Sequence, residues 1–497
     1  MRVSINAKKG CCVLAILIRA LVLPVTALGI PDILKDPLGV QPDRLHTGAM
    51  LPDGSLIACP ASVDLSQPLE LGSAVDVALC SNPQIRSAWA AIKVQSGVLG
   101  EARAAYLPTV NVSVSRLSNW SGSSSLSGTY DSFRTGNQLY GTLTWRLLDF
   151  GGRSAHNKAA SQLLVAALAA HEASLQKTMK DVIKAYFEAM TAQSSFIARK
   201  KMVEIAERIL AATKRREDRG TVPLSDTLQA LTALCKARLN EARAQGDFNK
   251  SLSLLVQAMG LAPGTPVHLP QTLELYRVDD VNNLNSLLRQ AEENHPAIRA
   301  ARAKLAADKA KIIVARSEGM PSLDATASLS RNGYPNQGLS SINQSVVTAG
   351  VTLNLPIFEG FARTYRIRGA EAQAEQSKAQ LQDATSQALT EVVKAHADAL
   401  TSLKTLKATE LLLVAATQSL HSSLRRYDRH AADILEVLNS QSALADAEQE
   451  RIRAVAEWRS ARLRLLAESG LLVRADLLQE REWQVRDSKK QDSLPGE

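Results

Sequence analysis

The sequence predicts a mainly α-helical protein that also carries two pairs of β-strands, built from a unit that occurs twice. Residues 153–219 and 370–469 contain neither Gly nor Pro, so two very long helical segments are expected. At four places hydrophobic residues alternate with polar ones over about ten residues, which is typical of β-strands. Landmarks in the first half recur about 210 residues later, which indicates a duplicated helix-strand-strand-helix-helix unit.

The composition excludes several classes of protein. The chain has 497 residues, of which 45% are hydrophobic and only 4% aromatic, with 26 Gly and 18 Pro. This balance argues against a collagen, a Gly/Pro-rich disordered chain and an ordinary all-β protein. The formal charge is +9, but acidic and basic residues are interspersed along the expected helices and do not cluster. We therefore expect no nucleic-acid partner.

The first 27 residues are typical of a secretory signal peptide. Lys8 and Lys9 form a basic start, an apolar run follows, and Val25-Thr26-Ala27 fits a cleavage site. Arg19 interrupts the apolar run, so an uncleaved anchor helix is the alternative. Beyond this leader no stretch approaches the roughly 18 apolar residues of a membrane-spanning helix. The sequence therefore predicts an exported chain.

Three cysteines follow the expected cleavage site: Cys59, Cys80 and Cys235. In an oxidising compartment a disulfide between Cys59 and Cys80 would stabilise the fold by roughly 3 kcal/mol, and two free thiols are the alternative. Cys235 lies in a helical run and is expected to be buried and unpaired. No CxxC or HExxH spacing occurs and the eight His are scattered, so we expect no metal or redox site.

The Gly- and Pro-free segments set the lengths of the helices. Residues 153–219 would form one helix of roughly 100 Å, whereas 370–469 would reach about 150 Å. The latter is too long for a compact domain, so we expect it to fold back at Arg426-Tyr427-Asp428-Arg429-His430. Shorter helices are expected over about 72–105 and 224–262. Together they match the length of 153–219, which predicts two helices stacked end to end beside one long helix, as in the wall of a hollow cylinder.

Four landmarks support the duplication. Asn82-Pro83 matches His295-Pro296 and Leu107-Pro108 matches Met320-Pro321, each 213 residues apart. Phe150-Gly151-Gly152 matches Phe358-Glu359-Gly360 at a separation of 208, and residues 220–228 match 430–438 at 210. Because the order is kept and the separation drifts little, we infer a repeat far longer than a solenoid unit.

The strand pairs are expected near residues 108–118 and 138–149, and again near 321–330 and 345–356. In the first strand Val110, Val112 and Val114 alternate with polar residues. These strand lengths fit tilted membrane-spanning strands, and soluble hairpins packed on a helix are the alternative. Polar loops that face the exterior are expected near 117–138 and 330–345.

Four strands per chain cannot form a membrane structure alone. A closed sheet that spans lipid needs at least about eight strands, and an open edge in hydrocarbon leaves backbone groups unpaired. The sequence therefore predicts a membrane β-barrel to which several chains contribute strands.

Several motifs resemble those of one protein family. They are residues 78–83 (A-L-C-S-N-P), 105–108 (A-Y-L-P), 145–153 (W-R-L-L-D-F-G-G-R), 355–360 (L-P-I-F-E-G), and Arg426-Tyr427 with residues 437–441 (V-L-N-S-Q). In this order, across about residues 65–472, they resemble the TolC-type outer-membrane channels of Gram-negative efflux and type I secretion systems. The resemblance implies a homotrimer whose chains each give four strands to one 12-stranded barrel, above a long α-helical periplasmic tunnel.

These observations together give the expected organisation of the chain. We expect a signal peptide (1–27), an N-terminal periplasmic segment (28–64), two structural repeats (65–270 and 271–475) and a charged, disordered C-terminal tail (476–497). The turns near 216–226 and 426–436 would then form the periplasmic tip.

The two tip turns match the positions at which a periplasmic adaptor (membrane fusion) protein docks in the family. The matching residues are Gly220, Thr221 and Val222 in the first turn and His430, Ala431 and Ala432 in the second. His430 stands where the family usually has Gly, and His takes a positive φ only at a cost. The second turn is therefore expected to differ in shape from the first.

Further residues match the periplasmic gate of the family. Asp226 and Tyr427 correspond to two of the three residues that hold the entrance closed, but the third, an Arg, corresponds to Ala432. The usual closing salt bridge therefore lacks its cationic partner. Glu436 and Asn439 correspond to two rings of acids, so one charged and one neutral ring should select cations less strongly. The alternative for Asp226 and Glu436 is an ordinary solvated position on a helix.

The leading hypothesis is a channel in the outer membrane that extends into the periplasm and interacts with outer-membrane lipid. An inner-membrane ABC exporter or proton-driven pump would deliver the substrate, with type I secretion of a protein toxin as the main interpretation and small-molecule efflux as the alternative. A periplasmic coiled-coil scaffold is the alternative from another class. No catalytic constellation, cofactor motif or G-x-x-x-x-G-K-[ST] sequence occurs, so we expect no enzyme activity. These patterns do not identify the cargo, the pump or the adaptor.

Overall fold

The computed structural model describes residues 36–40, 59, 67–125, 128–270, 283–332, 344–429, 431–470 and 472. Residues 1–41 and residues 42–497 form two compact units, and each is described by itself. In the first unit, Asp36 accepts hydrogen bonds from the backbone amides of Gly39 and Val40 and closes a short turn. The expected signal peptide, nearly all of the segment 28–64, and the C-terminal tail lie outside the described residues.

The second unit contains two consecutive sets of elements in the same order. The first set comprises α3 (Leu71–Ser81), α4 (Pro83–Ala104), β1 (Thr109–Ser125), β2 (Gly128–Leu148), α5 (Gly152–Glu217) and α6 (Leu224–Ala258). The second set comprises α7 (Leu284–Asn294), α8 (Pro296–Ser317), β3 (Ser322–Asn332), β4 (Gln344–Asn354), α9 (Ala362–Asp428) and α10 (Ile434–Glu468). The predicted fold class, mainly α with duplicated strand pairs, is confirmed.

The register of the duplication changes at the strands. Elements before the strands repeat at 213 residues, since Pro83 and Pro296 each begin a helix. Helices after the strands repeat at 210, because Gly151 and Phe361 both lie at the N-cap with positive φ. The sequence match of Phe150 with Phe358 at 208 is therefore not the structural equivalence. Phe150 (φ 49°) corresponds to Gly360 (φ 58°), so each turn has one Phe and one Gly in the left-handed region, in opposite order.

The helix expected over 72–105 is wrong as a single element, because the chain breaks at Asn82. Pro83 begins α4 at a position where its missing N–H is harmless, while Asn82 is extended (φ −66°, ψ 124°) and its side chain accepts from the Gln84 amide. In the second set His295 and Pro296 repeat this break. A Pro that starts one helix also ends the helix before it.

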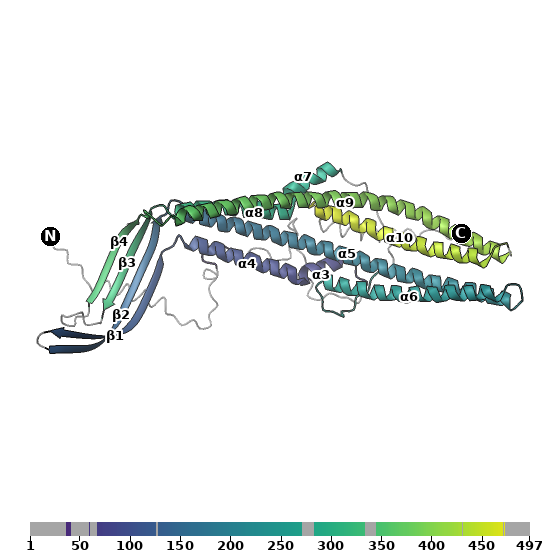
Figure 1. The fold of residues 1–497 in the computed structure, drawn as a ribbon, viewed down its shortest axis with the longest axis horizontal. Coiled ribbons are helices and arrows are strands. Elements are labelled where there is room, and N and C mark those ends of the chain that lie inside the picture. Colours follow the sequence, from purple (N-terminus) through teal and green to yellow (C-terminus); the bar gives the residue numbers. More distant parts are fainter. Residues whose placement is uncertain are drawn as a thin grey trace. The chain divides into compact units, whose positions relative to one another are not determined.

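The two long helical segments behave as predicted. α5 is one helix of 66 residues, and the segment 370–469 folds back after Asp428 into α9 and α10. Figure 1 shows α4 and α6 following one another along α5, as the predicted end-to-end stacking requires. The side-chain amide of Asn82 donates to the Ala258 carbonyl (3.3 Å), so the end of α6 meets the break between α3 and α4.

The strands form one antiparallel sheet with the order β1-β2-β3-β4. The polar loop expected over 117–138 is wrong, since β1 and β2 pair continuously from Thr109↔Thr144 to Ser125↔Gly128. Backbone hydrogen bonds between two strands do not require an apolar face, which explains why a polar segment stays extended here. Residues 333–343, most of the second expected loop, lie outside the described residues.

The main hydrophobic core lies where the middle of α5 meets α3, the end of α6, α9 and α10. Trp458, Leu175, Met179 and Leu255 are almost completely buried there. A second cluster, which includes Met202, Ile209, Tyr427, Ile434 and Val437, lies near the turns between the long helices. Within the described residues, no helix is long and apolar enough to cross a membrane.

The cysteines follow the expected pattern only in part. Cys59 and Cys80 are joined by a disulfide, which ties residue 59 to the end of α3. Cys235 has no disulfide partner and is exposed, so its predicted burial is wrong. Its neighbour Leu234 occupies the buried position on α6, and a shift of one residue turns a side chain by about 100° around a helix.

Candidate functional site

The turns between the paired long helices lie together at the end of the helices that is remote from the sheet (Figure 1). The first turn follows Glu217 and is closed by hydrogen bonds from the Gly220 amide to the Glu217 carbonyl (2.7 Å) and from the Thr221 amide to the Arg216 carbonyl (2.9 Å). Gly220 has φ +73°, the left-handed conformation that commonly ends a helix. The left-handed conformation therefore explains why a Gly occupies position 220 of this turn.

The second turn has the same closing hydrogen bond. The Ala431 amide donates to the Arg426 carbonyl (2.8 Å), as the Thr221 amide donates to Arg216 in the first turn. His430, the residue expected to change the shape of this turn, lies outside the described residues. Gly220, Thr221 and Ala431 are exposed, whereas Val222 and Ala432 are half-buried. The two turns thus present a similar backbone with different side chains.

Tyr427 connects the two helical hairpins. Its hydroxyl lies 3.4 Å from that of Thr213, and Arg216 donates to its carbonyl oxygen (2.9 Å). The guanidinium of Arg216 also stacks over the Tyr427 ring at 4.2 Å and pairs with Asp428 at 3.0 Å. The Arg216 side chain is only 17% exposed, so it is largely withdrawn from water. One arginine of α5 therefore makes three contacts with two successive residues of α9.

Asp226 is not brought to Tyr427 within the described chain. It is half-buried in the first turn of α6 and accepts a hydrogen bond from the Ser225 hydroxyl (3.3 Å). Glu436 lies in the first turn of α10 and forms an ion pair with Arg426 (2.8 Å), whose second nitrogen donates to the Ala431 carbonyl. Asn439, one turn further along α10, is exposed. Of the four matched gate residues, only Tyr427 links the two hairpins.

Arg216 and Thr213 were not singled out from the sequence, and Arg426 and Asp428 were named only for the expected fold-back and the Arg426-Tyr427 motif, although all four make these contacts. The repeat contains a signal for two of them. Arg216 and Arg426 are 210 residues apart and supply the carbonyl that closes their respective turns. Their side chains nevertheless point to different partners, Arg216 to the other hairpin and Arg426 to its own. Sequence spacing alone does not distinguish these two orientations.

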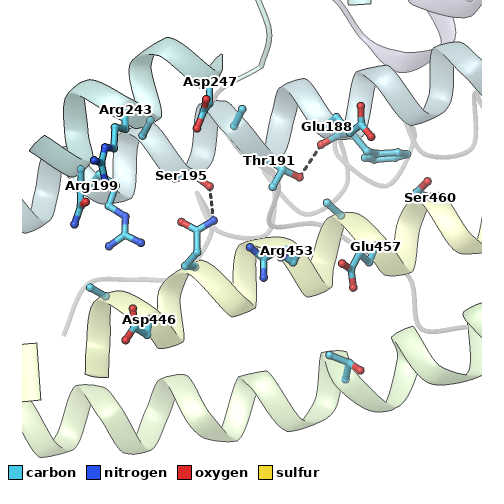
Figure 2. A pocket seen from close by; sticks show the side chains of 18 of the residues that line it. Glu188, Thr191, Ser195, Arg199, Arg243, Asp247, Asp446, Arg453, Glu457 and Ser460 are labelled. Carbon is cyan, nitrogen blue, oxygen red and sulfur yellow. Dashed lines mark hydrogen bonds between the residues drawn. The ribbon is translucent and has the colours of Figure 1, made fainter. Parts of the chain in front are cut away.

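A groove of about 1560 Å³ runs between the α5–α6 and α9–α10 pairs. Figure 2 shows Arg199, Arg243 and Asp247 on one side of it and Asp446, Arg453 and Glu457 on α10 opposite. Its lining includes Asn439 and has seven acidic and seven basic residues. Most of the residues that line the groove are polar or charged and their charges balance, which suits hydrated solutes. The groove lacks the mostly apolar lining of a small-molecule binding pocket.

Burial changes the titration of three acids on these helices. Burial raises the pKa of Glu448 on α10, although Lys201 and Arg199 oppose this shift. Burial likewise raises the pKa of Glu172, which pairs with Arg299 at 2.6 Å. Burial also acts on Asp308, but hydrogen bonds from Lys311 (2.8 Å) and Ser377 (2.6 Å) outweigh it and lower the pKa of that carboxyl. Glu172 and Asp308 join neighbouring helices through these contacts, and the three acids are spread along the bundle.

The described part of the chain contains no group of three or more His, Cys, Asp or Glu side chains arranged to hold a metal ion. The candidate site therefore consists of the two turns, the Arg216–Tyr427 contact and the polar groove.

Known proteins share both the sequence pattern and this fold. The family described as outer membrane efflux protein matches residues 74–261 and 287–471. These segments cover three quarters of the chain and coincide with its two sets of helices and strands. The chain belongs to the outer membrane efflux protein family. Membership shows a transport protein of the outer membrane that extends into the periplasm, as the motifs imply.

Individual relatives extend over nearly the same region. Protein CyaE of Bordetella pertussis is 36% identical over 420 residues, which cover 84% of this chain and 88% of CyaE. The alkaline protease secretion protein AprF of Pseudomonas aeruginosa is 23% identical, covering 81% of this chain and 84% of AprF. The crystal structure of VceC from Vibrio cholerae aligns with a TM-score of 0.70 at 20% identity, covering 80% of this chain and 96% of that one. The fold of this family member is therefore that of known outer-membrane channels.

Proposed function

We propose that three copies of the chain assemble into one channel in the outer membrane. Within the described residues, the order β1-β2-β3-β4 leaves one unpaired edge on β1 and another on β4. Hydrocarbon does not tolerate unpaired edges, and four strands are too few to close into a barrel. Pairing β4 of one chain with β1 of the next removes every edge when three chains supply twelve strands. These two open edges are the observation that carries the proposal.

We propose further that the channel is a passive duct for type I secretion of a protein. The polar groove, with equal numbers of acidic and basic residues, suits a hydrated polypeptide that must pass without being bound. AprF, whose name states that it serves secretion of a protease, aligns over most of this chain. CyaE is more similar still, at 36% identity. Efflux of small molecules, the second candidate, is favoured by the family's description.

The proposed partners are a periplasmic adaptor and an inner-membrane exporter. Gly220, Thr221 and Ala431 are exposed at the turns, where a helical adaptor would meet the channel end-on. Since the sequence contains no nucleotide-binding motif, the energy for export would come from the exporter, an ABC protein for secretion or a proton-driven pump for efflux.

Two measurements test these proposals. The particle mass in mild detergent should be about three times that of one mature chain, and a monomer that inserts into lipid would contradict the barrel. Deleting the gene in its own host should remove a large protein from the culture medium and leave drug susceptibility unchanged. Increased drug susceptibility with normal secretion would support efflux instead.

We also propose that Arg216 holds the periplasmic end closed. Widening that end requires the α9–α10 hairpin to move away from α5, and Arg216 is the side chain that binds both Tyr427 and Asp428 across this junction. It would thus replace the arginine that the family usually has at the position of Ala432.

Conductance in planar bilayers tests the role of Arg216. Arg216→Ala should raise single-channel conductance severalfold, and Arg216→Lys should give an intermediate value because it keeps the charge but loses the planar fork. Asp226→Ala is the matched control and should raise conductance only modestly, since Asp226 accepts a hydrogen bond from the neighbouring Ser225 and not from the other hairpin among the described residues. Equal conductance of Arg216→Ala and the unmodified channel would reject the closing role.

Ion selectivity tests the ring positions separately. Arg426 neutralises Glu436 within the same chain, which weakens the field that three copies of Glu436 would create. Glu436→Gln should therefore reduce cation preference slightly, and Arg426→Gln should increase it. Unchanged selectivity in both variants would show that Glu436 does not line the constriction.

A further inference from the structure

The register of the sheet gives it one apolar and one polar face. Val110, Val112 and Val114 of β1 lie on the same face as their register partners Leu143, Gly141 and Leu139 of β2. The three valines are 65–76% exposed, and Val347, Val351 and Leu353 continue this face on β4. The other face carries Asn111, Ser113, Thr142 and the Arg146–Asp324 ion pair. If the strands insert into the membrane as proposed, the apolar face contacts lipid.

This lipid-facing surface becomes basic at its end remote from the helices. Arg116 is the next residue on that face after Val114, and Arg331 is the next after Leu329. Both side chains are exposed, and neither forms an ion pair with a described residue. Arg331 is opposite Leu139 and Arg116 is opposite Asn137, so their Cα atoms are on the order of 12 Å apart from strand spacing and rise.

An aromatic pair lies further out on the same face. Trp120 and Phe133 are directly opposite each other in the β1–β2 register and are 76% and 70% exposed. They lie about 14 Å along the strand beyond Arg116. The exposed polar residues Ser118, Thr135 and Asn137 separate them from the apolar band. This pair is therefore not the upper border of the apolar band and needs a different partner.

The order along this face, from apolar side chains through two arginines to two aromatic rings, matches one class of lipid. We propose that the outer end of β1–β3 binds the lipopolysaccharide of the outer leaflet. Its acyl chains would contact the valine band, and its phosphates would accept hydrogen bonds from Arg116 and Arg331, whose planar guanidinium groups suit phosphate. The C–H faces of its sugars would stack on Trp120 and Phe133.

An ordinary phospholipid could contact the apolar band and the two arginines but not the aromatic pair. Its phosphate could bind the arginines, but it has no sugar to reach rings about 14 Å further along the strand. Among the described residues, the β2–β3 pairing runs to Gln138↔Asn332, and no described residue of β3 or β4 pairs alongside Trp120 or Phe133. The aromatic pair is therefore available to a tall headgroup. This inference rests on the proposed insertion of the strands and adds the identity of the lipid.

Binding to the purified, assembled channel tests the proposal, with lipopolysaccharide titrated in detergent and bound copies counted by native mass spectrometry. Arg116→Gln/Arg331→Gln should weaken binding at least tenfold, and enzymatic removal of the phosphates should weaken binding to the unmodified channel equally. Trp120→Ala/Phe133→Ala should abolish the preference for lipopolysaccharide over its lipid A part. Arg302→Gln/Arg368→Gln removes two exposed arginines from helices and should have no effect.

The outcomes separate this inference from the proposed function. Particle mass and channel conductance are measured on the same preparations, so a failure to form an inserted trimer refutes the assembly and not the lipid. In an intact channel, unchanged binding by Arg116→Gln/Arg331→Gln, or equal affinity for phosphatidylglycerol and lipopolysaccharide, would overturn the proposal.

Discussion

The two halves of the chain have helices of nearly equal length but strands of very different length. α3 and α7 have 11 residues each, α4 and α8 have 22, α6 and α10 have 35, and α5 and α9 have 66 and 67. In contrast, β1 and β2 have 17 and 21 residues, whereas β3 and β4 have 11 each. Duplication has thus preserved one part of the unit and not the other.

Packing explains this difference. Each long helix contacts several neighbours along its length, and both interhelical turns lie at the same end of the helices, so a change in one helix would shift all its contacts. Within the part of the chain that the structure describes, the outer part of the β1–β2 hairpin pairs only with itself, since the described β2–β3 pairing runs to Gln138↔Asn332. The lengths of the helices are therefore constrained by their neighbours, whereas the length of the outer β1–β2 hairpin is not.

Deletions test this comparison directly and should give the largest effect. Removing residues 192–198 shortens α5 by about 10 Å. This variant should not assemble, because residues 199–217 of α5 would no longer lie beside their partners on the neighbouring helices. Replacing residues 120–133 with Asn-Gly joins the paired residues Asn119 and Arg134 through a two-residue turn. This variant should assemble normally, with a dissociation temperature within a few degrees of the unmodified protein on heated gels. Comparable losses in both variants would show that the hairpin is also constrained by packing.

Much of the helical fold was predictable from the sequence because Gly and Pro limit helices in a simple way. The absence of both over residues 153–219 predicted α5, and the recurrence of Asn82-Pro83 as His295-Pro296 predicted a repeat. The break at Asn82 was missed, although Pro83 signals it, because the apolar pattern continues across it. The outer hairpin was missed because its few apolar residues, such as Trp120 and Phe133, stand among many Ser, Gly, Thr and Asn residues without regular alternation, so periodicity did not indicate a strand.

The site was less predictable than the fold. Motif positions indicated Tyr427 and the two turns, since these depend on local sequence. The partner of Tyr427 is Arg216, which lies 211 residues away, and its choice depends on how two hairpins pack. The ion pair between Arg426 and Glu436 was missed for the same reason, because a turn must form before these side chains can meet.

Equivalent glycines at the ends of α6 and α10 give the next largest effect. Gly260 and Gly470 both have φ +74°, so Ala at either position costs about 1–2 kcal/mol in the left-handed region. A Cβ at Gly260 would lie 2.8 Å from the Asn82 Cα, whereas at Gly470 the nearest atom is 3.8 Å away. Gly260→Ala should therefore destabilise by a further ~1–3 kcal/mol in chemical unfolding in detergent. Equal losses of unfolding free energy in Gly260→Ala and Gly470→Ala would show that the surroundings of Gly260 are as loosely packed as those of Gly470.

A partly buried ion pair, two residues before Gly470, distinguishes the second half from the first. Glu468 is 6% exposed and pairs with Lys180 at 2.9 Å, whereas Ala258 occupies the equivalent place at the end of α6. Glu468→Ala should cost about 1–3 kcal/mol, towards the lower value because Lys180 is partly exposed and can turn to water. Lys180→Ala with the double variant completes a cycle that isolates the pair. Strictly additive losses would show that the pair adds nothing.

The smallest expected effect separates the two equivalent helix caps. Asn82 accepts from the Gln84 amide at 2.8 Å, and His295 accepts from the Ala297 amide through Nδ1 at 3.3 Å. Burial lowers the pKa of His295, Glu468 of α10 partly opposes this, and Lys180 of α5 adds to it. The neutral ring, the only form in which Nδ1 can accept, is thus favoured in the folded state.

The sign of the pH dependence follows from this lowered pKa. In the unfolded chain His295 protonates near its ordinary pKa of about 6.5, while in the folded protein it stays neutral to lower pH. The free energy of unfolding therefore decreases as the pH falls from about 6.5 through the lower folded-state pKa. Because His295 is partly exposed, the loss should stay below the ~1 kcal/mol of a helix cap. His295→Asn should remove this component from unfolding measured between pH 7 and pH 5, and Asn82→His should add a similar one to the first half. A pH profile that is identical in His295→Asn and the unmodified protein would show that the two caps are equivalent despite their different residues.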